Sequence, residues 1–129
     1  MKFVIMLVLV VLTKQERTFN ESEVYGEWGW LYSKGGLMDH VLTPENTKVS
    51  KKIVLTKDHV AMIFTGDSLI FRKNYQIRTE KTLFSELPMP VLGLAGLNKT
   101  QTVTLVSKDT LDLKDNAFDG YMHRYVRLK

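Results

Sequence analysis

Hydrophobic and polar residues alternate along most of the chain after Val24. The alternation comes in short runs, such as KKIVLT at 51–56, HVAMIFT at 59–65 and TVTLVS at 102–107. A period of two is typical of half-buried strands, because successive side chains point to opposite faces of a sheet. Helical periodicity is hard to find. The sequence therefore predicts an all-β protein.

Three connections between these runs share one composition. TKDH at 56–59, TGDS at 65–68 and SKDT at 107–110 supply aspartate or glycine, which tolerate the positive φ of tight two-residue turns. Each connection predicts a hairpin. We expect about eight strands, with 68–80 forming two strands or one long bent strand: 24–33, 49–56, 59–65, 68–73, 74–80, part of 82–95, 102–107 with 110–113, and 121–128.

Hairpins in sequence order, without a long crossover, favour an antiparallel up-and-down β-barrel, because closure removes the exposed sheet edges. One segment interrupts the pattern, LPMPVLGLAGL at 87–97. Pro88 and Pro90 argue against a central strand there. We expect an apolar loop that plugs the barrel, caps a ligand cavity or contacts a partner.

The first residues have the layout of a secretory signal peptide: one lysine, ten apolar residues at 3–12, and then a polar stretch. We predict a signal peptide and short leader at 1–20, a barrel domain at 21–129, and an exported, periplasmic or secreted protein. Ten helical residues span about 15 Å, half of a bilayer core, which disfavours stable membrane insertion. A buried strand is the alternative for 3–12.

Charge and composition exclude several classes of function. The 18 basic residues fall to 16 without Lys2 and Lys14, against 14 acidic residues, and they do not cluster. Nucleic-acid binding is therefore not expected. The chain has no cysteine, so it offers no disulfide and no thiolate nucleophile or ligand.

Candidate catalytic chemistry is sparse. His40, His59 and His123 lie in separate elements without metal-ligand spacing. We expect His59 to be a solvated turn residue and His123 to face the barrel interior beside a polar partner. The carboxylates at 112, 115 and 119 are expected to form a solvated acidic loop. No enzyme activity, cofactor or metal site is predicted.

Aromatic residues concentrate in VYGEWGWLY at 24–32. Alternation places Val24, Gly26, Trp28, Trp30 and Tyr32 on one face, which we expect to point inward. In the last strand, Tyr121, His123, Tyr125 and Arg127 share a face.

Motifs along the chain resemble those of a known protein family. Seven motifs follow one another in the order that resembles small bacterial lipocalin-like (calycin-type) domains of unknown function. They are GEWGW at 26–30, GG at 35–36, TPEN at 43–46, IVL at 53–55, YQI at 75–77, LDL at 111–113 and DGYMHRYVR at 119–127. The resemblance covers 24–128. It implies a barrel closed at one end by Gly26 and Trp28, with an arginine of the last strand across the indole. We expect Arg127 in that place, with Arg124 as the alternative. The chain is shorter than full-size lipocalins and lacks their disulfide and central Thr-Asp-Tyr motif.

The leading functional prediction is a monomeric, exported lipocalin-like barrel that binds a small apolar molecule. The alternative is a protein-interaction module, for instance an inhibitor of a secreted hydrolase, that contacts an envelope or secreted partner through its loops. The candidate ligand-lining residues are also those a barrel would use as its core: Trp30, Tyr32, Leu55, Met62, Phe64, Phe71, Tyr75, Ile77 and Tyr125.

Overall fold

The computed structural model describes residues 19–129. Most of the predicted signal peptide therefore lies outside the described residues. Among residues 19–129, no helix combines the length and the apolar character needed to cross a membrane.

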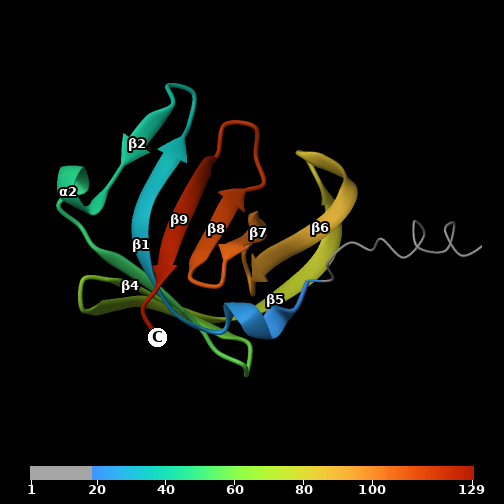
Figure 1. Cartoon of the computed structure of the whole chain (residues 1–129), viewed down its shortest axis with the longest axis horizontal. Helices are drawn as coiled ribbons and strands as arrows, with labels where there is room; N and C mark the ends of the chain where they lie inside the picture. The colour runs from blue at the N-terminus through green and yellow to red at the C-terminus, as the bar shows by residue number, and fades with distance from the viewer. Residues whose placement is uncertain (1–18) are drawn as a thin grey trace, which may run out of the picture.

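A single antiparallel sheet of nine strands makes up most of the described structure (Figure 1). The strand order is β2-β1-β3-β4-β5-β6-β7-β8-β9, and β1 also pairs with β9. The ring of β1 and β3 to β9 therefore closes, which confirms the predicted all-β, up-and-down barrel of eight strands. The strand bounds are β1 Gly26–Gly35, β2 His40–Leu42, β3 Lys51–Leu55, β4 Val60–Thr65, β5 Ser68–Thr82, β6 Ser85–Leu94, β7 Thr100–Ser107, β8 Thr110–Asp115 and β9 Tyr121–Arg127.

Two short helical segments flank β1. The 3-10 helix η1 (Glu21–Val24) precedes it, and the α-helix α2 (Pro44–Thr47) follows the small strand β2. Thr43 caps α2 by accepting from the backbone N–H of Asn46, whose side chain accepts in return from the N–H of Thr43. Neither β2 nor α2 was predicted, because both are too short to produce a periodic pattern.

The three predicted hairpins are present between β3 and β4, β4 and β5, and β7 and β8. Positive φ in the first turn falls on His59 (φ 65°) rather than Asp58, and in the second on Gly66 (φ 60°). Residues 68–82 form one long strand that pairs with β4 up to Asn74 and with β6 from Tyr75 onward.

The expected loop at 87–97 is mostly strand, since β6 runs to Leu94. Its two prolines are accommodated because β6 pairs with β7 only through 91–93. Pro88 and Pro90 precede that section, where β6 is paired on one side alone and one edge needs no backbone N–H.

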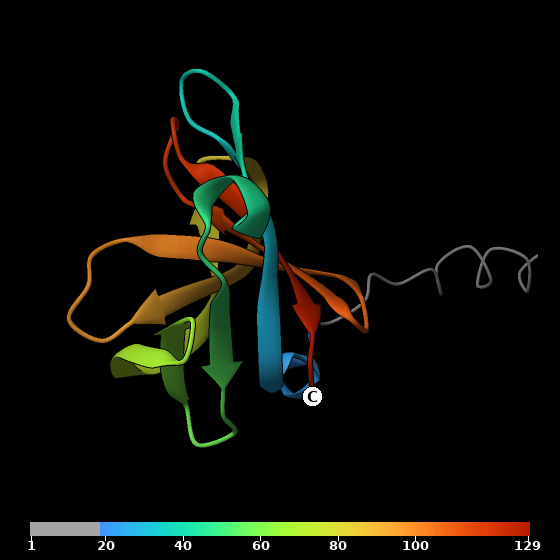
Figure 2. The ribbon, with the colours of Figure 1, turned by 90° about the vertical axis from the view of Figure 1, so that its left-hand side faces the viewer.

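Packed apolar side chains form a core inside the barrel. Ten buried residues form one cluster, with Phe19, Ile63, Ile77, Leu94, Leu105 and Tyr125 packed against it. Figures 1 and 2 show η1 and the C-terminus at one end of the barrel, called the closed end here, and the β1–β2 and β8–β9 loops at the opposite end. The cluster consists of Val24, Trp28, Ile53, Leu55, Ala61, Tyr75, Leu92, Val103, Leu111 and Leu113.

Candidate functional site

The closed end contains the pair that the sequence singled out. The guanidinium of Arg127 lies 4.2 Å from the ring centroid of Trp28, and the two residues are paired between β9 and β1. The indole N–H of Trp28 donates to the carbonyl of Val24 at 2.9 Å. Arg124, the alternative, instead forms a bidentate pair with Asp112 and lies over Tyr32.

Six of the nine candidate lining residues face the interior. Leu55 and Tyr75 belong to the buried cluster, and Ile77 and Tyr125 pack against it. Trp30 is buried and pairs with Tyr125 across β1 and β9, while Phe71 pairs with the inward-facing Ile63. These residues act as core, as their pattern also implied.

Tyr32 does not face inward. The β1–β9 register shifts between Trp30 and Tyr32, so that Tyr32 pairs with Arg124 while Ser33 pairs with His123. A bulge of one residue makes the side chains after it in the strand point to the opposite face of the sheet from the one that simple alternation predicts. Tyr32 therefore lies on the outer wall and Ser33 takes the buried position.

Met62 and Phe64 also lie on the outer face, against expectation. Ala61 is fully buried opposite Leu55, which sets the inner face of β4. Phe64 instead pairs with Lys52, whose ammonium lies 4.7 Å from the phenyl centroid. The small alanine, rather than the large methionine, fits the crowded space beside Leu55.

A part-buried polar cluster links β1, β8 and β9. The Trp30 indole N–H donates to the Ser33 hydroxyl at 2.8 Å, and the Ser33 hydroxyl lies 2.6 Å from Nδ1 of His123. Nε2 of His123 lies 3.1 Å from Asp115. Ser33 is only 3% exposed, whereas the side chains of His123 and Asp115 are 24% and 32% exposed. The cluster joins three strands of the barrel wall.

Asp115 is half-buried rather than part of a solvated loop. Burial raises the pKa of its carboxyl, but hydrogen bonds from His123, Gln101 and the backbone N–H of Tyr121 outweigh burial and lower the pKa to about 2. The Asp115 carboxylate is therefore held ionised inside the polar cluster.

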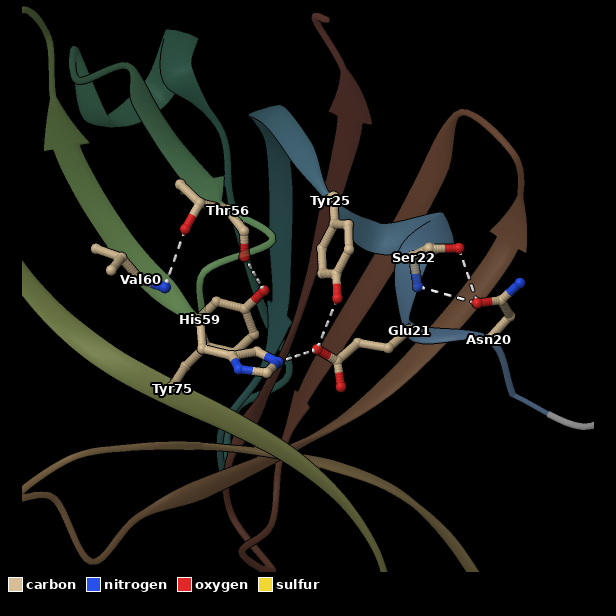
Figure 3. Close-up of polar contacts among 8 residues, drawn as sticks. All are labelled: Asn20, Glu21, Ser22, Tyr25, Thr56, His59, Val60 and Tyr75. Atoms are coloured by element: carbon tan, nitrogen blue, oxygen red, sulfur yellow. Dashed lines mark hydrogen bonds and ion pairs between the residues drawn. The ribbon is translucent and has the colours of Figure 1, made fainter.

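A second polar cluster lies at the closed end, where η1 meets the β3–β4 turn (Figure 3). Glu21 Oε2 lies 2.6 Å from Nε2 of His59 and accepts a hydrogen bond from the Tyr25 hydroxyl at 3.2 Å. The His59 ring meets the edge of Tyr75, whose hydroxyl donates to the carbonyl of Thr56. Burial raises the pKa of Tyr75 well above its usual range. His59 is thus a half-exposed but anchored residue.

Beside this second cluster, a pocket of about 620 Å³ opens between β5, β6 and the turns around them. Of the nine candidate lining residues, only Tyr75 contributes to it. Most of its other side chains are polar, and none of these was predicted from the sequence to line a ligand site. The lining comprises Asp58, His59, Asn74, Tyr75, Gln76, Arg78, Glu80, Val91, Gly93, Leu94, Ala95 and Thr100.

An apolar groove of about 690 Å³ lies on the outer face of β1, against β2 and α2. Leu31, Tyr32, Val41 and Pro44 contribute its apolar surface. Tyr32 is the one candidate lining residue in it, and it is there because the bulge in β1 turned it outward.

The opposite end of the barrel, called the loop end here, presents the most exposed apolar side chains. Leu37 and Met38 in the β1–β2 loop are 87% and 77% exposed, and Phe118 in the β8–β9 loop is 87% exposed. A backbone hydrogen bond from Gly36 to Gly120 joins the two loops, and Figures 1 and 2 both show them side by side.

Sequence reasoning missed the contacts of Ser33 and Asp115 with His123, and it did not predict that polar residues line the 620 Å³ pocket. The first two depend on the bulge and on strand register, which no local pattern reveals. The polar stripe of β5 could have been predicted from the sequence, because polar residues occupy every second position from 74 to 80: Asn74, Gln76, Arg78 and Glu80. Within residues 19–129, no group of three or more histidine, cysteine or acidic side chains could hold a metal ion.

Comparison of the chain with protein-family models, with curated proteins and with solved structures found no match. The lipocalin-like resemblance therefore remains a prediction from the motifs.

Proposed function

We propose that the protein is a binding module that docks on a second protein through the loop end of its barrel. The observation that carries the proposal is the exposure of Leu37, Met38 and Phe118 on two adjoining loops. Large apolar side chains gathered at loop tips cost free energy in water and gain it when a partner covers them.

Charge favours a protein partner over a lipid surface. Asp39 follows Leu37 and Met38, and Asp119 follows Phe118, while the loops at 36–39 and 116–120 contain no lysine or arginine. Peripheral membrane binding relies on basic residues beside the apolar ones, because cellular membrane surfaces are anionic. The partner expected here has an apolar recess bordered by basic groups. The predicted export makes an envelope or secreted protein the expected class.

Carriage of a small apolar molecule inside the barrel receives less support. The interior holds the packed cluster, and neither of the two pockets described for residues 19–129 is lined by more than one of the nine candidates. A ligand of that kind would have to displace side chains that stabilise the fold.

The test has two steps. Cross-linking in the host identifies the partner protein, and the affinity of the barrel for that purified partner is then measured. The variant L37S/M38S/F118S is expected to weaken binding at least tenfold, since three exposed apolar anchors are lost. The matched control L69S/I70S removes two half-exposed apolar residues at the far tip of the β4–β5 hairpin and is expected to bind like the wild type. Equal loss in both variants, or loop-dependent binding to phosphatidylglycerol vesicles without a protein partner, would contradict the proposal.

A further inference from the structure

We infer that the pocket of about 620 Å³ beside β5 and β6 is a binding site for a neutral carbohydrate. The inference concerns a different face from the loop end and does not depend on the partner proposed there. It rests on the polar wall, the small apolar floor and the charge balance of the pocket.

The wall of the pocket is the polar stripe of β5. Asn74, Gln76, Arg78 and Glu80 occupy alternate positions on one face and all line the pocket. Among residues 19–129, none of these four side chains has a hydrogen-bond or ion-pair partner. Their donors and acceptors are therefore available to a ligand.

The floor of the pocket is formed by Val91 and Gly93 on β6 and by Thr100 on β7. Gln76, Gly93 and Thr100 are paired across β5, β6 and β7 and so share a face, which also carries Val91. A Cβ added at Gly93 would meet only the methyl group of Thr100, at 3.9 Å. The hollow thus exists because position 93 has no side chain, and it leaves a shallow apolar surface on which the C–H face of a sugar ring can lie.

The balance of donors and acceptors fits hydroxyl groups. Arg78 can only donate, the carboxylates of Asp58 and Glu80 can only accept, and the two amides do both. A sugar hydroxyl also does both, so each wall residue finds a partner on such a ligand. Two carboxylates against one arginine oppose an anionic ligand, and the many polar groups oppose an apolar one, because their unmet hydrogen bonds would cost free energy.

One end of the pocket is preorganised. His59 lines it, and its ring is fixed by Glu21 on one side and by the edge of Tyr75 on the other (Figure 3). His59 also adopts a left-handed backbone conformation, which costs free energy for a residue with a side chain. A volume of about 620 Å³ lies within the usual range for small-molecule sites.

The experiment is a titration followed by amide chemical shifts, using maltotriose, cellotriose and chitotriose as neutral probes, with citrate as anionic and spermidine as cationic comparison. At least one trisaccharide is expected to shift the amides of Gln76, Gly93 and Ala95 saturably. The variant G93L fills the floor without backbone strain, since Gly93 does not have a positive φ, and is expected to weaken binding at least tenfold at an unchanged melting temperature.

Two further variants keep the test decisive. T104L places the same leucine side chain at an exposed position of β7 outside the pocket and is expected to bind like the wild type. Q76A removes an amide from the wall without changing the floor and is expected to weaken binding even if G93L fails to fold. The inference is overturned if no trisaccharide shifts these amides, if only citrate or spermidine does so, or if binding survives in both G93L and Q76A.

Discussion

The guanidinium of Arg127 stacks on the indole of Trp28 and, in the same position, donates hydrogen bonds to the carbonyls of Tyr25 at 2.9 Å and Glu23 at 2.7 Å. One side chain of the last strand thus ties the first strand and η1 together. Because η1 covers the core there through the buried Val24, we expect the closed end of the barrel to depend on this contact.

Replacement of Arg127 by alanine should therefore destabilise the whole barrel. The variant loses a cation–π contact of about 0.5–2 kcal/mol and the hydrogen bonds that Arg127 donates to the carbonyls of Glu23 in η1 and of Tyr25 just after it. We expect the free energy of unfolding in urea to fall by about 1–3 kcal/mol. Arg72→Ala, at an exposed position of β5, is the control and should change it little. An unchanged urea midpoint for Arg127→Ala would show that the contact does not support closure.

Gly26 and Gly66 should respond differently to alanine. Both have positive φ, of 131° and 60°, but a Cβ at Gly26 would lie 2.5 Å from the carbonyl oxygen of Lys129, whereas nothing lies within 4 Å at Gly66. We expect Gly66→Ala to cost about 1 kcal/mol from backbone strain alone. Gly26→Ala adds a clash with backbone and should cost about 2 kcal/mol or more. Thermal melts of both variants check the order, and equal losses would contradict it.

Ser33→Ala should leave the indole N–H of Trp30 buried without an acceptor. An unsatisfied buried donor costs about 1–3 kcal/mol, so we expect the free energy of unfolding to fall by that amount. Ser68→Ala, at an exposed position, provides the control. A loss no greater than that of the control would mean that Trp30 finds another acceptor.

The free energy of unfolding should decrease as the pH is lowered, and part of this decrease should come from Asp115. Its pKa is about 2 in the folded protein and about 4 in an unfolded chain. Because the folded pKa is the lower one, the contribution of Asp115 is fully present above about pH 4 and is lost as pH falls toward 2. The carboxylate is about one third exposed, so solvent screening limits the effect to about 1 kcal/mol.

Asp115→Asn tests this pH dependence directly. The variant should be less stable than the wild type at pH 6, and the difference should shrink between pH 4 and pH 2. Asp119→Asn, in the exposed part of the same loop, should leave the pH profile unchanged. Parallel profiles for the wild type and Asp115→Asn would contradict the assignment of a lowered pKa.

The sequence predicted the features that depend on local pattern. Alternation identified most of the strands, though not β2 or the full length of β6. The three short turns identified the hairpins, and their order along the chain identified a barrel without crossovers. The contact between Trp28 and Arg127 was expected from the resemblance to lipocalin-like domains, which implies an arginine of the last strand across the first-strand tryptophan. The interior position of His123 followed from the same alternation.

Alternation could not decide which face of a strand points into the barrel after the register between paired strands shifts. A bulge after Trp30 turned Tyr32 outward and buried Ser33, and the packing of Ala61 against Leu55 sent Met62 and Phe64 to the outer wall. Both outcomes depend on the fit between side chains of neighbouring strands, which no single segment specifies. The pocket beside β5 has the same origin: its wall, floor and anchored histidine come from segments that only the closed barrel brings together.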